Sequence, residues 1–232
     1  MTTAYVGSEL DVFANAINWK HYVARHLRTF IRGDVLEVGS GIGSMTQVLC
    51  GGARHWTCLE PDANLSARAR ILLDRTAMNC EFRVGTLDAL RQDETFDTIL
   101  YMDVLEHIAD DRKELNRAAL HLRPSGALCA VAPAHPMLYS KFDRAIGHVK
   151  RYTKKTLSAA GPSGLRLERL RYLDCCGLLA SAANRFILRS AAPTRRQIVF
   201  WDRVLVSLSR VLDPVAGYRV GKSVLAIWKR MD

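Results

Sequence analysis

The segment 35–44, VLEVGSGIGS, constrains the fold more than any other part of the chain. An apolar run is followed at once by glycines at alternate positions, Gly39, Gly41 and Gly43. Glycine allows a positive φ, and it lets the N–H groups at a helix start approach a ligand with no side chain in between. A dinucleotide-binding turn would place its third glycine where this chain has Ser44. The segment predicts a strand, a tight turn and a helix that bind a nucleotide-like cofactor.

A carboxylate follows the turn at the distance expected of a ribose-binding residue. Glu60 ends the apolar run 55–60. In Rossmann-like sites, a carboxylate about 20 residues after the turn, at the end of the second strand, holds the ribose hydroxyls. Pro61 and Asp62 then stop the strand and begin the next helix. This spacing favours a cofactor site over a turn that is only structural.

Strand-like and helix-like segments alternate along the chain, the pattern of a βαβ architecture with a parallel sheet. Strands are predicted near residues 34–39, 55–60, 81–85, 96–102, 126–132, 165–173 and 222–229. Two of the intervening helices are predicted from apolar residues that share one face: Leu65, Ala69, Leu72 and Leu73 in the first, and Leu115, Ala118, Ala119 and Leu122 in the second. We expect one α/β domain over residues 1–232.

Three motifs carry a family resemblance. The turn, with an acidic residue two positions before the first glycine, resembles motif I of the class I S-adenosylmethionine (SAM) methyltransferases. The segment 101–108, YMDVLEHI, is similar to the D-V-L-E-H signature of members related to ubiquinone-biosynthesis enzymes, and the segments 133–135 and 147–153 resemble a bacterial branch of that superfamily. The resemblance covers nearly the whole chain. It implies SAM as cofactor and a Rossmann-like seven-stranded, mostly parallel sheet with an antiparallel last edge strand.

The resemblance also implies which residues contact SAM. Those in the strand ends and loops are Glu37, Gly39, Ser40, Gly41, Gly43, Glu60, Pro61, Thr86, Leu87, Met102, Asp103 and His107. The segment 9–22 predicts an amphipathic helix, and in similar methyltransferases an N-terminal segment of this kind, here residues 1–33, covers the cofactor. Trp19 and Tyr22 are expected to touch it, whereas packing on the sheet edge is an equal alternative for Phe13 and Ile17.

The acceptor is expected beyond the carboxyl ends of the strands, where ligands of open α/β sheets bind. Histidine suits a general base because its ordinary pKa lies near neutrality, and two histidines lie in the loop region after the fifth strand. His148 is the first candidate for the catalytic base and His135 the second. Tyr139, Arg151 and Tyr152 are predicted to bind the acceptor.

A metal site is the alternative for the segment after the fourth strand. Asp103, Glu106 and His107 are spaced to converge at a helix start, and related ubiquinone-pathway methyltransferases use an acidic-x-x-E-H cluster around magnesium. Asp103 stands where a glutamate would be expected. We predict that this segment caps the helix and borders the cofactor pocket, with no metal.

About 50 residues, 174–221, replace what would otherwise be a tight hairpin between the last two strands. Their apolar residues mark two helical faces, Leu179, Ala182 and Phe186, and Trp201, Val204, Leu205, Leu208, Val211 and Leu212, the second ending at Pro214. Arginines accompany both. A substrate lid or a dimer surface is favoured over a membrane-surface element, because each stripe looks narrow enough to be covered by packing.

Composition limits the partners. The net charge of +10 is compatible with nucleic acid, anionic lipid or acidic substrates, but the arginines are dispersed, so no specific nucleic acid is expected. No [ND]-P-P-[YF] sequence follows the fourth strand. The six cysteines are scattered and are interpreted as reduced packing residues. With no membrane-spanning stretch and no secretory signal pattern, we expect a cytoplasmic monomer or homodimer and leave peripheral membrane contact open.

The sequence therefore predicts a SAM-dependent methyltransferase that acts on a small-molecule, lipid-like or glycosylated metabolite, at oxygen. Two alternatives remain. One is a nucleic-acid (RNA) methyltransferase, which the positive charge suggests. The other is a non-catalytic SAM-binding regulator, which we disfavour because the cofactor turn is intact.

Overall fold

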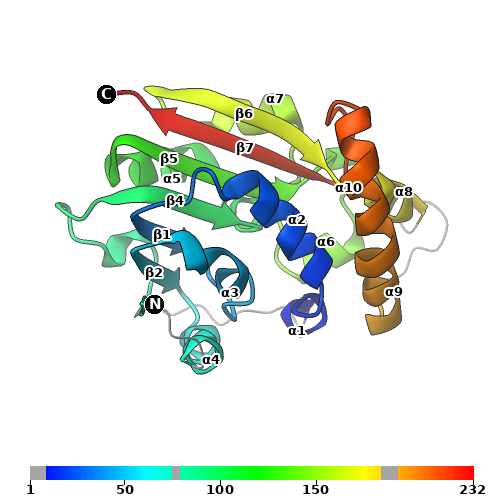
Figure 1. Cartoon of the computed structure of the whole chain (residues 1–232), viewed down its shortest axis with the longest axis horizontal. Helices are drawn as coiled ribbons and strands as arrows, with labels where there is room; N and C mark the ends of the chain where they lie inside the picture. Colours follow the sequence, from blue (N-terminus) through cyan, green and yellow to red (C-terminus); the bar gives the residue numbers. More distant parts are fainter. Residues whose placement is uncertain (1–8, 75–78, 184–192) are drawn as a thin grey trace.

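A seven-stranded sheet in the order β3-β2-β1-β4-β5-β7-β6 forms the centre of the molecule (Figure 1). The structure is a computed structural model that describes residues 9–74, 79–183 and 193–232. The strands are β1 Asp34–Val38, β2 His55–Glu60, β3 Cys80–Val84, β4 Phe96–Met102, β5 Leu122–Pro133, β6 Leu165–Leu173 and β7 Ser223–Arg230. The predicted α/β class and all seven predicted strands are confirmed.

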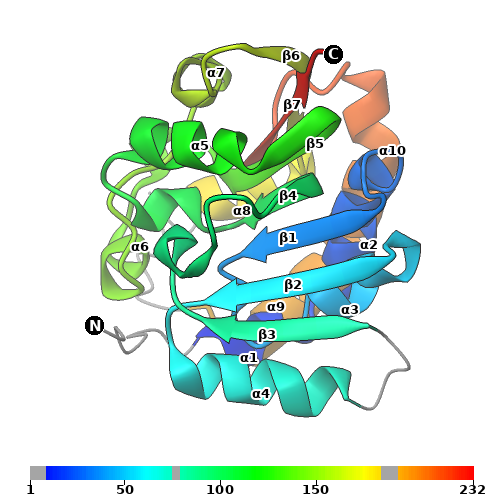
Figure 2. The same cartoon turned by 90° about the vertical axis from the view of Figure 1, so that its left-hand side faces the viewer.

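The sheet is parallel except for β7. Strands β3, β2, β1, β4 and β5 pair in parallel, and Figure 2 shows the first four side by side. As predicted, the last strand is antiparallel, but it lies between β5 and β6, and β6 is outermost. The sequences explain this order. Strand β7 is buried over residues 223–228, whereas β6 alternates with arginines and is only half-buried, as suits an edge strand.

Helices cover both faces of the sheet. The α-helices are α1 Glu9–Phe13, α2 Ile17–Leu27, α3 Thr46–Leu49, α4 Ala63–Leu73, α5 Asp111–Leu120, α6 Lys141–Ala145, α7 Lys154–Ala160, α8 Cys175–Ala183, α9 Arg195–Phe200 and α10 Val206–Val215, with a π-helical turn, η6, at Trp201–Leu205. One buried cluster joins α2 and η6 to one sheet face, and a second joins α5 and α7 to the other. No helix in the described ranges is long and apolar enough to cross a membrane.

Three element boundaries differ from the sequence-based expectation. The single helix predicted over residues 9–22 is broken between α1 and α2. Strand β5 begins at Leu122, four residues early, because the chain passes Pro124 and Ser125 (φ 59°) without leaving the sheet. Helix α10 continues through Pro214 to Val215, since a proline in the last turn removes few helical hydrogen bonds.

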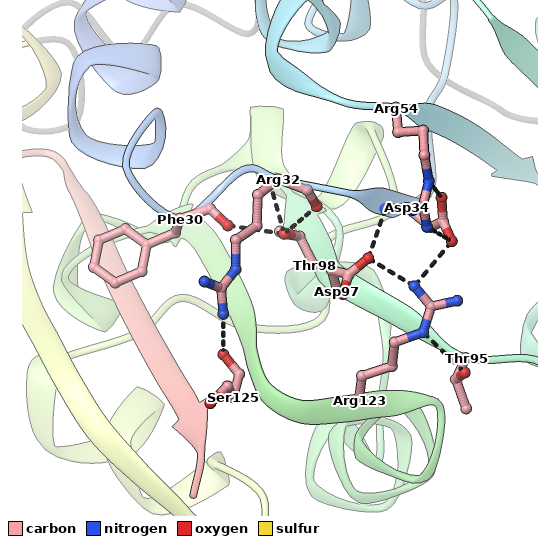
Figure 3. A network of polar contacts seen from close by, with 9 residues as sticks. All are labelled: Phe30, Arg32, Asp34, Arg54, Thr95, Asp97, Thr98, Arg123 and Ser125. Atoms are coloured by element: carbon pink, nitrogen blue, oxygen red, sulfur yellow. Dashed lines mark hydrogen bonds and ion pairs between the residues drawn. The ribbon is translucent and has the colours of Figure 1, made fainter. Parts of the chain in front are cut away.

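A closed polar network holds the amino ends of β1, β4 and β5 together (Figure 3). The guanidinium of Arg123 lies 2.7 Å from Asp97 and 2.9 Å from Asp34, and Arg54 donates to both carboxyl oxygens of Asp34 at 2.8 and 2.6 Å. Asp97 also accepts from the Asp34 backbone N–H. Hydrogen bonds from Arg54, then those from Arg123, lower the pKa of Asp34 to about 2 against the effect of partial burial. Asp34 and Asp97 therefore each have a cationic partner.

Candidate active site

The glycine turn lies at the carboxyl end of β1, and all three of its glycines have positive φ, at 71°, 55° and 75°. A Cβ on Gly39 would lie 2.6 Å from a Val104 methyl, and one on Gly43 would crowd helix α4. These two glycines let the turn pack closely. A Cβ on Gly41 would meet only Leu10, at 3.9 Å, so this position faces open space. The backbone at Gly41 is open to an approaching cofactor.

Glu60 lies against the turn from the end of β2. One of its carboxyl oxygens accepts from the Gly41 N–H at 2.8 Å, and the other accepts from the Asp62 N–H at 3.0 Å. Asp62 in turn caps α4 through its side chain. Burial raises the pKa of Glu60. The carboxylate predicted to hold a ribose is thus fixed beside the one glycine of the turn that faces open space.

Glu37 lies beneath the turn, with 1% of its surface exposed. Its carboxylate accepts from the Thr46 hydroxyl at 2.6 Å and from the Trp56 indole at 2.9 Å. Burial raises the pKa of Glu37 to about 7 against these hydrogen bonds, and Glu60 raises it further. Glu37 joins α3 and β2 from inside the protein, so its observed contacts support the turn.

The other predicted cofactor residues of the loops gather at the carboxyl ends of β1 to β4. Ser40 is buried in the turn and Pro61 directly follows β2. Thr86 is exposed after β3 and accepts from the Asp88 N–H, while Leu87 is buried. Met102 is the last residue of β4. The topology therefore brings residues from four separate segments to one edge of the sheet.

Helix α2 packs on the insertion through the two aromatic residues predicted to touch the cofactor. The ring centroids of Trp19 and Trp201 lie 5.8 Å apart, and the backbone N–H of Trp19 donates to Asp202 at 2.8 Å. The Tyr22 hydroxyl donates to Asp213 at 2.6 Å. The polar group of Tyr22 is thus used within the protein, and α2 is tied to the insertion.

Lys222, next to β7, was not among the sequence-based candidates. Its ammonium lies 3.5 Å from the Trp201 ring centroid and 5.8 Å from that of Trp19. Burial lowers the pKa of Lys222, and Asp174 and Asp103 oppose this effect. Asp103 follows β4 with φ 54°; burial raises its pKa, and Lys222 and His148 lower it. Lys222 is therefore close enough to Asp103 for each to influence the other's ionisation.

Glu106 is a fully buried carboxyl group next to His148. Neither of its oxygens has a hydrogen-bond partner among the described residues. One lies 3.7 Å from His148 Nε2. Burial raises the pKa of Glu106 well above its usual range, and Asp103 raises it further. A buried polar group left unpaired in this way is costly to the fold, so it points to a role in binding or catalysis.

His148 is held by a second carboxylate. Its Nδ1 lies 3.0 Å from Asp143 Oδ1 and its Nε2 faces Glu106. Asp143 is fully buried and accepts two hydrogen bonds from the Arg151 guanidinium, at 2.7 and 2.9 Å, and one from the Ser140 N–H. Although burial raises it, hydrogen bonds from His148 and Arg151 hold the pKa of Asp143 well below its usual range. An ionised carboxylate therefore fixes the ring and leaves Nε2 for the site, as in catalytic Asp-His pairs.

His107 packs edge-on against His148, with ring centroids 4.7 Å apart. Burial, then the charge of His148, lowers the pKa of His107 to about 4, so this ring is neutral at neutral pH. Glu106, His107 and His148 each offer one ligand atom, and the three atoms lie within 4.8 Å of one another. Two imidazoles and a carboxylate at this spacing are able to hold a divalent ion. The set differs from the sequence-based alternative, since His148 takes the place of Asp103.

The other residues predicted in the acceptor loops support the fold around His148. His135 Nε2 bonds to the Gly221 carbonyl at 2.9 Å. The Tyr139 hydroxyl donates to the His148 carbonyl at 2.6 Å, and the Tyr152 hydroxyl donates to the Leu105 carbonyl at 3.0 Å. The guanidinium of Arg151 is occupied by Asp143. A shallow pocket of about 280 Å³ lies on this loop, lined by Pro136, Tyr139, Val149, Lys150 and Arg151.

The sequence-based analysis did not identify Asp143, Lys222 and Trp201. Asp143 lies five residues before His148, a spacing that indicates no contact unless the intervening turn is known. Lys222 and Trp201 reach the site only because β7 inserts beside β5. The one available signal was the Ser140-x-x-Asp143 capping pattern, which marks a helix start and places Asp143 near the loop.

Comparison with known proteins agrees with the fold and the turn. Residues 35–126 match a family model described as a methyltransferase domain. A ubiquinone biosynthesis O-methyltransferase of Paramagnetospirillum magneticum is 32% identical over 100 residues, which cover 43% of this chain and 40% of that protein. Another, from Nitrobacter winogradskyi, is 29% identical over 46% of this chain and 41% of that protein. The chain thus matches about two fifths of the length of these curated relatives.

Solved structures extend the likeness to nearly the whole chain. A SAM-dependent methyltransferase from Clostridium acetobutylicum superposes with a TM-score of 0.62 at 10% identity, covering 97% of this chain and 96% of that one. The N-methyltransferase NodS from Bradyrhizobium japonicum, in complex with S-adenosylhomocysteine, has a TM-score of 0.61 at 14% identity, with 94% and 88% covered. At these identities the likeness concerns the fold.

Residues 35–126 thus match a methyltransferase domain, and the whole sheet has the fold of solved SAM-dependent methyltransferases. Over less than half of its length, the chain is also similar in sequence to ubiquinone biosynthesis O-methyltransferases. These matches agree with the resemblance that the motifs carry.

Proposed function

We propose that this chain transfers the methyl group of SAM to an oxygen atom of a small-molecule acceptor, with His148 as the general base. The observation that carries the proposal is the Asp143-His148 pair: Asp143 holds Nδ1, and Nε2 lies 3.7 Å from the buried Glu106 carboxyl. A hydroxyl must lose its proton during methylation. A base fixed by an ionised carboxylate supplies this step.

The chain's residues divide the work. Bound SAM supplies an electrophilic methyl group on a sulfonium sulfur. Gly39, Gly41 and Gly43 would present backbone to it, and Glu60 would accept from its ribose hydroxyls. His148 Nε2 takes the acceptor's hydroxyl proton as the oxygen–methyl bond forms and the sulfur–methyl bond breaks, leaving S-adenosylhomocysteine. Asp143 keeps the imidazolium oriented and stabilises its charge.

The acceptor side is bordered by groups from both the loops and the insertion. The Trp201 and Trp19 rings are buried beside the Lys222 ammonium, whose charge acts on Asp103. Apolar rings behind the site would help to exclude water from the transferring group. The names of the ubiquinone-pathway relatives agree with an aromatic hydroxyl as the acceptor group.

An acceptor screen with labelled SAM tests the proposal. Matched pairs that differ only in the nucleophile, such as a catechol with its aminophenol counterpart and a phenol with its aniline, are incubated with the purified chain. We expect label on the oxygen acceptors. Faster labelling of the anilines would contradict oxygen transfer, and binding of S-adenosylhomocysteine without transfer to any acceptor class would favour the non-catalytic regulator.

The nucleic-acid alternative has its own test. Any affinity of the chain for RNA or DNA should be independent of sequence and should fall steeply with added salt, because dispersed arginines contact only phosphates. Filter binding across a salt series measures this. Labelling of tRNA, rRNA or DNA at physiological salt that exceeds labelling of small phenols would overturn the small-molecule proposal.

A further inference from the structure

Helices α9 and α10 and the turn η6 form one continuous helix over residues 195–215 on the outer side of the molecule (Figure 1). At 1.5 Å per residue it is about 30 Å long. Its inner face is packed against α2 and α8 and buries Ile198, Trp201, Val206 and Ser209. The helix is therefore fixed to the domain along one face and free along the other.

The outer face carries a stripe of exposed apolar side chains. Phe200, Val204, Leu208, Val211 and Val215 follow one another at four, four, three and four residues, which places them on one side of a helix. They are exposed, Val211 at 67% and Val215 at 83%. The expectation that packing covers the predicted face is met at Trp201, which is buried, but not at Val204, Leu208, Val211 and Leu212, which are exposed.

Arginines line one edge of this stripe. Arg196, Arg203 and Arg210 are spaced by seven residues, so they share one side of the helix, and all are exposed. The ion pairs among the described residues involve other basic side chains. These charges therefore lack a partner within the described part of the molecule.

The acidic residues of this region are all turned inward. Between residues 193 and 221, all of which the structure describes, the only acids are Asp202 and Asp213, and both are buried. Asp202 accepts from the Asn18 and Trp19 backbone, and Asp213 accepts from Tyr22. The outer face is therefore apolar and positive, with no negative charge of its own to attract a second copy.

We propose that residues 195–215 dock this protein on an anionic lipid surface, lying in the plane of the interface. An apolar stripe with a row of arginines beside it complements acyl chains and anionic head groups at once. The opposite side of the same helix is buried and carries Trp201, whose ring centroid lies 3.5 Å from the Lys222 ammonium. The surface itself does not depend on methyl transfer.

Vesicle cosedimentation tests the proposal. The full chain should bind vesicles of phosphatidylcholine mixed with phosphatidylglycerol and should not bind phosphatidylcholine alone. Replacing Arg203 and Arg210 by Gln should weaken binding about fivefold for each charge removed. Leu208→Ser with Val211→Ser should weaken it about tenfold or more, since exposed apolar area no longer enters the lipid.

Matched control variants test whether the effect is specific to this surface or common to any exposed apolar or basic residue. Leu120 is exposed at 76% on α5, and Arg112 is exposed on the same helix. Leu120→Ser and Arg112→Gln should leave vesicle binding unchanged. Binding of S-adenosylhomocysteine, measured by calorimetry, should be the same in all variants, so lost vesicle binding is distinguished from unfolding and from failure of the cofactor site.

Three results would overturn the proposal. The first is equal vesicle binding by the stripe variants and the controls. The second is no vesicle binding by the wild type together with a dimer, seen by light scattering, that Leu208→Ser with Val211→Ser splits. The third is binding of nucleic acid, but not vesicles, through Arg203 and Arg210.

Discussion

Acidic side chains at the two ends of the central sheet have opposite electrostatic surroundings. At the amino end, Asp34 and Asp97 are surrounded by arginines, and the pKa of Asp34 falls to about 2. At the carboxyl end, Asp103 and Glu106 lie without an arginine partner of their own, and burial raises the pKa of both. The ion pairs at the amino end stabilise the fold. The carboxyl groups at the carboxyl end destabilise it but are available for binding or catalysis.

This contrast indicates where function lies without reference to any relative. Buried charges are ordinarily paired, and breaking a pair is costly. Glu106 has no hydrogen-bond partner within the described residues, and Arg151 does not pair with it because its guanidinium binds Asp143. At the carboxyl end, Arg151 therefore serves to hold the carboxylate that orients His148. Five predictions test this division between the two ends.

The largest effect is expected in the glycine turn. Gly41→Val should abolish binding of S-adenosylhomocysteine, because a branched side chain would fill the open space that Gly41 faces and strain a residue with φ 55°. Calorimetry measures the binding, and circular dichroism checks the fold. As the paired variant, Gly39→Val should instead destabilise the fold through its clash with Val104. Normal binding by Gly41→Val would remove the turn from the cofactor site.

The next largest effect is expected at His148. His148→Ala should lower turnover by roughly 10²- to 10⁴-fold with little change in S-adenosylhomocysteine affinity, as for loss of a positioned base. Asp143→Asn should lower turnover less and shift the pH profile, while His135→Ala should be mild because that ring bonds to a backbone carbonyl. Activity that survives in His148→Ala at unchanged acceptor affinity would reduce His148 to a structural residue.

A metal-ligand role for His148 is separable from a base role. Dialysis against a chelator should leave the wild-type turnover unchanged if His148 acts as a base. Loss of activity on dialysis, restored by one divalent ion, would show instead that Glu106, His107 and His148 act together as ligands.

Glu106→Gln should affect activity and stability in opposite directions. Turnover should fall, whereas the free energy of unfolding should stay the same or rise, because the buried carboxylate and its repulsion by Asp103 are removed. A carboxyl group whose pKa is raised in the folded state destabilises the fold once the pH exceeds the ordinary pKa of that group in the unfolded chain. The gain in unfolding free energy on Glu106→Gln should therefore be larger at about pH 8 than at about pH 5. Denaturant unfolding at both pH values measures it, and a clear loss of stability would contradict this account of Glu106.

The smallest effect is expected at the amino end. Asp34→Asn should cost about 1 kcal/mol of unfolding free energy and leave turnover unchanged, because Asp34 is partly exposed and far from the glycine turn. In the wild type this contribution is complete above the ordinary pKa of about 3.9 and is lost as pH falls through about 2. Asp93→Asn, in the exposed pair with Arg91, should cost almost nothing. A drop in turnover for Asp34→Asn would break the division between the two ends.

The fold was predictable from the sequence because its signals are local. The strands are short apolar runs, and Gly39, Gly41 and Gly43 required positive φ whatever lay around them. Glu60 was predictable for the same reason, since its distance from the turn is set by one helix and one strand. The site depends on long-range contacts. Asp143 and Lys222 act only through neighbours that the loop geometry and the β7 insertion bring to them.

The insertion shows a different limit. The periodic apolar residues of this segment indicate a helix, and the structure has one. The period alone does not predict which face of that helix is buried. The helix buries Trp201, Val206 and Ser209 because Asp202 and Asp213 must reach partners in α2 and after β6. Hydrogen bonds of buried acids thus accompany the burial of Ile198, Trp201 and Val206 on the same face of this helix.

The position of β7 between β5 and β6 fixes the order in which these strands can pair during translation. Strand β6 pairs with β7 and, among the described strands, with nothing else, so it has no place in the sheet until residue 230 has left the ribosome. Cys129 and Ile227 are register partners although nearly a hundred residues separate them. Pairing over such distances is slow. During translation, one edge of β5 therefore stays unpaired while about 40% of the chain has not yet been synthesised. An unpaired strand edge is prone to aggregation, so we expect a chaperone to be needed most at this edge.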